Sequence, residues 1–300
     1  SNDRIFISDQ DGHLLIFKSD GTFVSQIKKG QGPGEIYKLW DFTYDDAKET
    51  LIVYQSDNLS YFDKNGKLLF EQRCPIMFVD FCTSDTKLVF IQPFSSNYHL
   101  GNVANKSVIV TDENLRISDI GLSALQTDSK AIVSSDAFIT KNDKSILISQ
   151  LLNDTIYELY NTSLEAKYII RYDNSIDSRD DNQIRTSSKF YHSGGFMETG
   201  NGQLFRFWSP QNGLCLVFRD KNTGKAVGGT RAVGAGSSIP HYCFATKGVY
   251  NGYFISSYVP QNGSNEFSSM KISEESKKSV LKLTEDDNPV LIMYKIKITQ

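Results

Sequence analysis

The stretch from Trp40 to Phe70, WDFTYDDAKETLIVYQSDNLSYFDKNGKLLF, contains four short runs of β-branched and aromatic residues separated by polar residues. Runs of this length, bounded by Asp, Asn and Gly, are typical of β-strands. The last turn, KNG at Lys64, contains an Asn-Gly pair. Such a pair tolerates the positive φ angles that a tight turn between antiparallel strands requires. The stretch is therefore predicted to form a four-stranded antiparallel meander.

The same pattern recurs along the chain. The apolar run at Leu51 has five counterparts, each preceded by a polar turn, which begin at Ile5, Leu88, Ile146, Leu204 and Tyr253. Tight turns follow downstream of the first five runs, at Ser19, Lys64, Glu113, Asn161 and Asn222. Four-stranded units that repeat in this way stack radially as the blades of a β-propeller. We predict an all-β, six-bladed β-propeller of four-stranded antiparallel blades, forming one domain over residues 1–300.

Composition excludes several classes of protein. The chain has 300 residues, 39% of them hydrophobic, which is ample for a buried core. The formal net charge is −3, and Lys and Arg are scattered among Asp and Glu, so a nucleic-acid partner is not expected. No apolar run approaches the roughly 20 residues of a membrane-spanning helix.

The four cysteines show no metal-binding spacing. They are Cys74, Cys82, Cys215 and Cys243, and none forms a C-x-x-C pair, which argues against a zinc knuckle. Each lies in or beside an apolar run, where a free cysteine behaves as a small hydrophobic residue. The pattern favours four buried thiols over a disulfide.

A glycine-rich stretch, KKGQGPGEIYKL at Lys28–Leu39, raises the alternative of a phosphate-binding loop. A Walker loop needs Gly-Lys-Ser/Thr at the start of a helix, and a dinucleotide-binding loop also needs a helix after it. Here a strand-like run follows. We therefore expect Gly30, Gly32 and Gly34 to take backbone angles closed to other residues and Pro33 to stiffen the corner between two blades, with Glu35 accepting hydrogen bonds from the loop amides.

Two motifs carry a specific resemblance to a known family: GQGPGE after the first repeat and DDNPVLIMYKIK at Asp286–Lys297. The chain resembles an uncharacterised six-bladed β-propeller family, related to NHL-repeat propellers and common in anaerobic Gram-negative gut bacteria. The resemblance covers nearly the whole chain and implies structural roles for the loop residues and for Asp287, Asn288 and Pro289. It implies no catalytic residues.

The resemblance also carries an expectation about location and chain ends. Family members usually have an N-terminal export or lipoprotein signal, which implies the periplasm or the outer cell envelope, with a lipid anchor in a removed segment. Members have a further stretch before the first blade. We expect the first blade to lack its innermost strand and the sixth its outermost, with an N-terminal segment missing from this chain.

Loop lengths are asymmetric between the two ends of the predicted blades. Connections between strands one and two, and three and four, are short throughout. The longest stretches, which include 93–106, 121–134, 174–188, 230–240 and 259–288, all belong to the opposite face. Because long loops on a rigid scaffold are where binding residues collect, we expect any ligand on the long-loop face.

Polar residues on that face are candidates for ligand binding. His192 and His241 open the predicted inner strands of blades five and six, and Arg185, Arg231, Tyr98 and His99 are loop residues suited to sugar or carboxylate recognition. Ordinary surface polarity is the alternative for all of them. Asp41, Asp80 and Asp136, in the predicted inner strands of blades two to four, are candidate ligands of a divalent cation. Their alternative is solvated or capped carboxylates at strand ends.

The remaining motifs give little information about function. SDQDG at Ser8 lacks the third carboxylate of a calcium loop, and no serine-hydrolase pattern is present. The segment at Ile272–Leu283 predicts one short helix over the sixth blade, with Ser273 as its cap and a Glu274–Lys278 pair. The leading hypothesis is a non-enzymatic binding or scaffold propeller without a cofactor, which recognises a glycan, peptide or protein. The alternative is a metal-dependent hydrolase or lyase with its site at the channel mouth.

Overall fold

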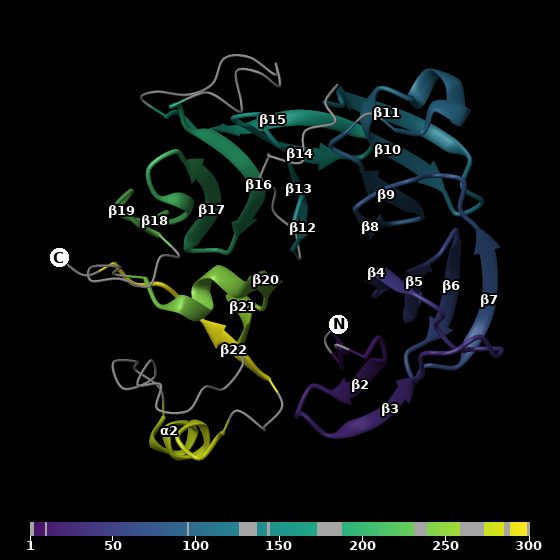
Figure 1. Cartoon of the computed structure of the whole chain (residues 1–300), viewed down its shortest axis with the longest axis horizontal. Coiled ribbons are helices and arrows are strands. Elements are labelled where there is room, and N and C mark those ends of the chain that lie inside the picture. The colour runs from purple at the N-terminus through teal and green to yellow at the C-terminus, as the bar shows by residue number, and fades with distance from the viewer. Residues whose placement is uncertain are drawn as a thin grey trace. The chain divides into compact units, whose positions relative to one another are not determined.

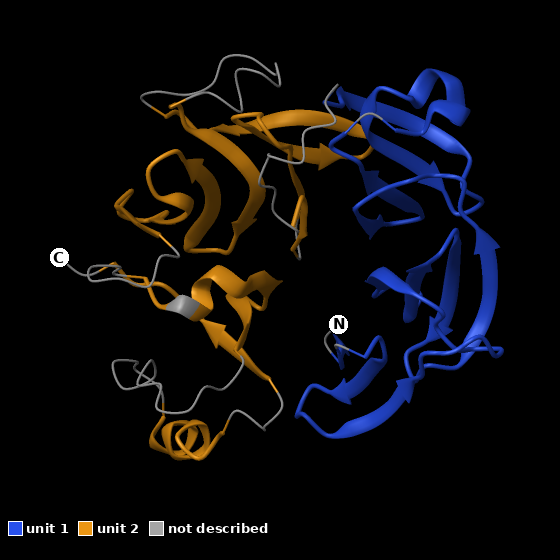
Figure 2. Ribbon diagram, viewed as in Figure 1, with its two compact units in different colours: residues 1–127 blue, residues 128–300 orange. Residues whose placement is uncertain are grey.

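The computed structural model describes residues 3–9, 11–94, 96–125, 137–142, 145–172, 188–230, 239–258, 273–284 and 289–298. The chain divides into two compact units, residues 1–127 and residues 128–300 (Figure 2). Each unit contains three antiparallel sheets, and the six sheets are the blades of a six-bladed β-propeller, which confirms the fold predicted from the repeats. That the chain is a single domain stays a prediction.

Unit 1 contains the first three sheets (Figure 1). The first consists of β1 (Arg4–Ser8), β2 (Leu14–Lys18) and β3 (Phe23–Ile27). The second consists of β4 (Leu39–Asp45), β5 (Thr50–Gln55), β6 (Asn58–Asp63) and β7 (Leu68–Arg73). The third consists of β8 (Asp80–Ser84), β9 (Lys87–Ile91), β10 (Lys106–Asp112) and β11 (Ile117–Ser123), with the 3-10 helix η1 (Tyr98–Val103) between β9 and β10.

Unit 2 contains the remaining three sheets. The fourth consists of β12 (Ile139–Lys141), β13 (Ile146–Ser149), β14 (Thr155–Tyr160) and β15 (Ser163–Ile169). The fifth consists of β16 (Tyr191–Glu198), β17 (Gly202–Ser209), β18 (Gly213–Asp220) and β19 (Ala226–Thr230). The sixth consists of β20 (Thr246–Tyr250), β21 (Tyr253–Tyr258) and β22 (Val290–Tyr294), accompanied by the 3-10 helix η2 (His241–Ala245) and the helix α2 (Glu274–Val280). Among the described residues the first and sixth sheets have three strands each, as expected.

The recurring apolar runs form equivalent strands, namely β1, β5, β9, β13, β17 and β21. β5 shows why such a run is continuously apolar. Leu51 and Val53 belong to a core cluster shared with the first sheet, whereas Ile52 belongs to a cluster shared with the third. Successive side chains of a strand point to opposite faces, so a strand packed between two blades needs apolar residues at every position.

In unit 2 a kink in β16 brings two sheets close together. The pairing of β16 with β17 shifts register between His192 and Phe196, and Gly194 has a φ of +76°. A Cβ atom at Gly194 would lie 2.5 Å from Cε1 of Phe138, so only glycine fits there. Sequence analysis did not single out this position, because the contact joins residues from different sheets.

The predicted helix is present as α2. The Ser273 hydroxyl accepts a hydrogen bond from the Ser276 amide at 3.1 Å, and Val280 packs against the core cluster that contains Phe254 and Tyr294 of the sixth sheet. The expected Glu274–Lys278 pair is wrong: Lys277 is the partner, with 3.2 Å between its Nζ and Glu274 Oε1. Among the described residues no helix is long and apolar enough to cross a membrane.

The glycine-rich loop between β3 and β4 is a closed corner. The Gly30 amide donates to the Ile36 carbonyl at 3.0 Å, and the Ile36 amide donates to the Lys28 carbonyl at 2.9 Å. The Glu35 carboxylate accepts from the Gly32 amide at 2.8 Å, beside Pro33. The loop amides that a phosphate would need are thus partly used within the loop, as expected of a structural corner.

The ends of each sheet differ in the length of their connections. At one end, called the short-turn end, every connection between strands has two to five residues. At the other, the long-loop end, the connections between successive strands include residues 28–38, 92–105, 124–138, 170–190, 231–245 and 259–289. Short turns suffice to join adjacent strands, so the additional chain at the long-loop ends is not required by the fold.

Candidate functional site

A groove of about 670 Å³ opens at the long-loop ends of the second and third sheets in unit 1. We call it the unit 1 groove. Its lining comes from the second sheet, from the connection between β7 and β8, and from the segment after β9. The lining residues are Trp40, Tyr54, Ser56, Asp57, Arg73, Cys74, Pro75, Ile76, Met77, Phe78, Gln92 and His99.

The connection between β7 and β8 builds the floor of the groove by alternation. Ile76 and Phe78 are buried in the core of unit 1, whereas Met77 between them is 54% exposed. Phe78 also stacks on Tyr54, with 4.1 Å between the ring centroids. An extended segment places alternate side chains on opposite sides, so the two anchors in the core hold the Met77 thioether in the groove.

Helix η1 fixes this floor from the other side. Asn97, buried and left-handed with a φ of 56°, accepts from the Met77 amide at 2.7 Å and donates to the Met77 carbonyl at 2.9 Å. His99 Nε2 lies 2.6 Å from the Pro75 carbonyl oxygen. A carbonyl can only accept, so His99 carries a proton on Nε2 and donates it. These bonds shape the groove before any ligand arrives.

Trp40 forms an exposed aromatic surface on one side. The residue is 57% exposed, although tryptophan side chains are mostly buried on average. The Lys38 ammonium lies 3.8 Å from the centroid of the indole, at a cation–π distance. Trp40 lines the groove, whereas Lys38 is not among the lining residues.

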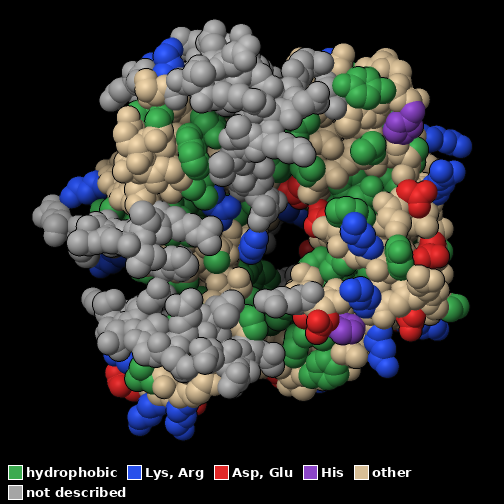
Figure 3. Space-filling model, viewed as in Figure 1, with side chains coloured by type: hydrophobic (Ala, Val, Ile, Leu, Met, Phe, Trp, Pro, Cys, Tyr) green, Lys and Arg blue, Asp and Glu red, His purple; other side chains and the backbone are tan. Residues whose placement is uncertain are grey.

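Opposite charges meet at the rim. Arg73 Nε lies 3.4 Å from Asp57 Oδ2, and both side chains are mostly exposed. The backbone below them is fixed, since the Cys74 amide donates to the Asp57 carbonyl at 2.7 Å. The charged pair adds no net charge to the groove. Figure 3 shows the same mixture on a larger scale, with acidic and basic side chains interspersed over unit 1.

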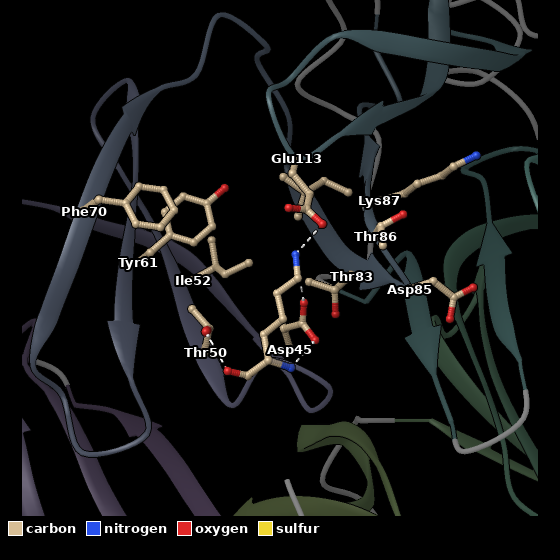
Figure 4. A pocket seen from close by; sticks show the side chains of 12 residues that line it. Asp45, Thr50, Ile52, Tyr61, Phe70, Thr83, Asp85, Thr86, Lys87 and Glu113 are labelled. Atoms are coloured by element: carbon tan, nitrogen blue, oxygen red, sulfur yellow. Dashed lines mark hydrogen bonds and ion pairs between the residues drawn. The ribbon is translucent and has the colours of Figure 1, made fainter.

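A second cavity of unit 1 lies at the short-turn ends of the same sheets (Figure 4). Its volume is about 170 Å³. Lys48 Nζ lies 2.6 Å from Glu113 Oε1, and Asp45 accepts from the amides of Ala47 and Lys48. Small-molecule sites usually measure about 300–1,000 Å³, so the unit 1 groove fits that range and this cavity does not.

Asp41 and Asp80 lie on β4 and β8, strands that contact each other within unit 1. Asp41 Oδ1 accepts from the Phe42 amide at 2.8 Å, whereas Oδ2 is buried without a hydrogen-bond partner. Burial raises the pKa of the Asp41 carboxyl to about 7, because the ion loses hydration. Asp136 lies outside the described residues. A divalent cation at these carboxylates stays a prediction.

His192 does not lie at an accessible surface. It is completely buried, with Nδ1 3.4 Å from the Tyr172 hydroxyl and no hydrogen-bond partner for Nε2. Burial lowers the pKa of His192 to about 4, so the ring is neutral at neutral pH. His192 thus lies at the start of β16, the first strand of the fifth sheet, as expected, but its side chain is in the interior of unit 2. A role in ligand binding stays a prediction.

The other predicted residues separate into three groups. His99 lines the unit 1 groove, and Tyr98 beside it is 69% exposed but does not line it. His241 was expected to open an inner strand, and instead it begins η2, with β20 starting at Thr246. Arg185 and Arg231 lie outside the described residues.

Most of the groove was not predicted from the sequence. Trp40, Asp57, Arg73 and Met77 lie in strands or tight connections that resemble ordinary blade structure, and no local pattern distinguishes an exposed Trp from a core Trp. The loop at Ser8 was not expected to bind a metal, yet its Asp9, Asp11 and His13 bring three potential ligand atoms within 4.8 Å of one another. His13 Nδ1 lies 2.8 Å from Asp9 Oδ2. Exposed groups of this kind often gather without an ion.

The sheets and the groove define a β-propeller with a preformed, mixed polar and aromatic recess on its long-loop side. The chain belongs to the family described as a domain of unknown function (DUF4934), whose model matches residues 1–295. The relation to NHL-repeat propellers and an origin in gut bacteria stay predictions. Among curated proteins, no sequence matches the chain.

Solved structures extend the comparison. The crystal structure of a "putative exported protein" from Bacteroides fragilis superposes with a TM-score of 0.78 over 99% of this chain and 88% of that one, at 18% sequence identity. The WD40 domain of Pan2 from Neurospora crassa is more distant, with a TM-score of 0.40, 13% identity and coverage of 76% of this chain and 62% of that one. At these identities the first similarity shows the fold alone.

Proposed function

We propose that this protein is a non-enzymatic binding or scaffold propeller, which recognises a glycan, peptide or protein at the long-loop ends of its sheets. The observation that carries the proposal is the unit 1 groove. Exposed apolar side chains and a few fixed polar groups converge in it, and this combination is typical of ligand sites. The floor is held by hydrogen bonds and core anchors, so binding requires little ordering of the protein.

The proposed location is the cell envelope, on the periplasmic or outer side, with a lipid anchor in a segment outside this chain. Support comes from the Bacteroides fragilis protein, which is described as a "putative exported protein" and has the same fold over nearly the whole chain.

The test is a binding screen with matched variants. Purified protein is screened by thermal shift against defined libraries of glycans and peptides, and hits are measured by calorimetry on Trp40→Ala and Tyr160→Ala. Tyr160 is also an exposed aromatic residue, but it lies at a short-turn end in unit 2. We expect affinity to fall about tenfold or more in Trp40→Ala and to stay unchanged in Tyr160→Ala. Hits that bind Trp40→Ala with full affinity would overturn the assignment of the groove.

A further inference from the structure

We propose that the unit 1 groove binds a neutral saccharide, with one sugar ring stacked on Trp40 and its hydroxyl groups bonded to the polar rim. This inference rests on the proposed function and narrows its ligand to one chemical class. It follows from four properties of the groove: an aromatic surface, a balanced set of donors and acceptors, a rigid floor and a suitable size.

The aromatic surface suits the C–H face of a sugar ring. A pyranose presents several C–H groups on one side, and these carry slight positive charge that the electron-rich face of an indole attracts. Trp40 is more than half exposed and lines the groove. The Lys38 ammonium lies over the indole, 3.8 Å from its centroid, so a sugar ring would stack on the opposite face.

The polar rim matches hydroxyl groups better than ions. Arg73 and Asp57 lie 3.4 Å apart and cancel each other's charge, so an anion would meet a guanidinium that already has a carboxylate partner. A hydroxyl group both donates and accepts, and adjacent hydroxyls on a sugar can accept from the guanidinium while donating to the carboxylate. The pair is therefore complementary to a neutral diol.

Two further side chains extend this pattern. Gln92 uses its Oε1 for the Phe94 amide at 3.4 Å, which leaves its NH₂ group as a donor. His99 donates from Nε2 to the Pro75 carbonyl, so in the tautomer with its proton on Nε2 the other ring nitrogen, Nδ1, can accept a hydrogen bond. The groove thus offers both hydrogen-bond donors and hydrogen-bond acceptors, as a polyhydroxylated ligand requires.

Rigidity and size agree with a short oligosaccharide. The floor is fixed through Ile76 and Phe78 in the core and through the two hydrogen bonds of Asn97 to Met77. A rigid site favours a weakly bound ligand most, because no binding free energy is lost in ordering the protein. A volume of about 670 Å³ lies within the usual range for small ligands.

The experiment uses the two tryptophans of the chain, Trp40 and Trp208. In the Trp208→Phe variant, fluorescence reports Trp40 alone. This variant is titrated with neutral trisaccharides, namely cello-, malto-, manno-, xylo- and N-acetylated chitotriose. Trigalacturonic acid is the anionic trisaccharide for comparison, and an apolar tripeptide is the peptide for comparison. We expect at least one neutral trisaccharide to change the emission, with an affinity that stays constant between low and high salt, because no net charge is neutralised.

Variants then locate the contacts. Trp40→Ala, measured by calorimetry in the wild-type background, should weaken saccharide binding about tenfold or more, and Asp57→Asn and Arg73→Gln should each weaken it several-fold. Tyr160→Ala should bind normally. All these positions are exposed, so circular dichroism and melting curves should match the wild type.

The remaining outcomes are distinguishable. Binding of trigalacturonic acid alone or of the peptide alone, lost in Trp40→Ala, would overturn the proposal of a neutral saccharide and leave the proposed function standing. If Trp40→Ala does not weaken saccharide binding, the groove is not the binding site, which would overturn both the saccharide proposal and the proposed function. No response to any neutral trisaccharide at millimolar concentration would overturn the saccharide proposal.

Discussion

At the scale of the residue, the surroundings of Asp41 oppose the ionisation of its carboxyl group. It lies on β4 with one oxygen bonded to the Phe42 amide and the other buried without a partner. Loss of hydration raises the pKa of this carboxyl from an ordinary value of 3.8 to about 7. The folded protein therefore holds a proton that the unfolded chain has already released between these two pH values.

This difference predicts a pH-dependent stability. Because the folded pKa is above the unfolded one, stability falls as pH rises from about 4 through 7 and stays reduced above it. The Asp41→Asn variant removes the charge, so we expect it to be more stable than the wild type by about 1–3 kcal/mol at pH 8, and by clearly less at pH 4.5, which is close to the unfolded pKa. Urea unfolding at the two pH values measures this.

Asp20 offers the matched control for this experiment. Hydrogen bonds from Thr22 lower the pKa of its exposed carboxyl, so this group is ionised in both states at neutral pH. Asp20→Asn should show no gain in stability at pH 8. Equal stability changes for Asp41→Asn at both pH values would show that the Asp41 carboxyl titrates normally.

At the scale of the element, the loop between β3 and β4 depends on its glycines for two different reasons. Gly34 has a φ of +78°, a conformation that costs other residues energy. Gly30 and Gly32 were also expected to need unusual backbone angles, and instead they are crowded by Glu35. A Cβ at Gly30 would lie 1.9 Å from Glu35 Oε2, and one at Gly32 would lie 3.0 Å from the same atom.

The crowding predicts that Gly30 and Glu35 are coupled. Gly30→Ala should displace the carboxylate from the Gly32 amide, at a cost of about 1 kcal/mol, and Glu35→Ala should cost about the same by removing that hydrogen bond. In the double variant the two costs should not add, which gives a coupling of about 1 kcal/mol in urea unfolding. Gly200→Ala, where a Cβ meets open space, is the control. Strictly additive costs would contradict the role of Glu35.

At the scale of the whole molecule, the cysteines are buried and form no disulfide. Cys74, Cys82, Cys215 and Cys243 all lie in the interior, as their apolar context predicted. Burial raises the pKa of Cys74 to about 11 and also raises that of Cys215. Since the thiolate is the reactive form, both burial and ionisation should suppress their chemistry.

Thiol titration tests this burial in a single experiment. The native protein should show no rapid reaction with Ellman's reagent, whereas the protein in urea should show all four thiols. The Lys278→Cys variant, with its substitution on the exposed side of α2, should add one fast thiol in the native state. A rapid native reaction would indicate that a core opens. Fewer than four thiols in urea would indicate a disulfide.

Local patterns were enough to determine the strands and turns of this protein. The runs at Leu51 and its counterparts form equivalent strands, and Asn-Gly or Asp-Gly pairs such as Asn65-Gly66 supply the turns with positive φ. Ser273 begins α2 for the same kind of reason. In each case the deciding interaction is between residues a few positions apart, so the sequence contains it directly. Repetition of the pattern then determined the number of blades.

The tertiary structure alone decided which side chains converge. Trp40, Met77 and His99 come from separate segments and meet in one groove, whereas the equally polar His192 is buried in β16 beside the kink at Gly194. Exposure and convergence depend on packing between segments that are distant along the chain. A hydrophobic pattern tells that a side chain is apolar, and only the packing of neighbouring blades decides whether it faces the core or a ligand.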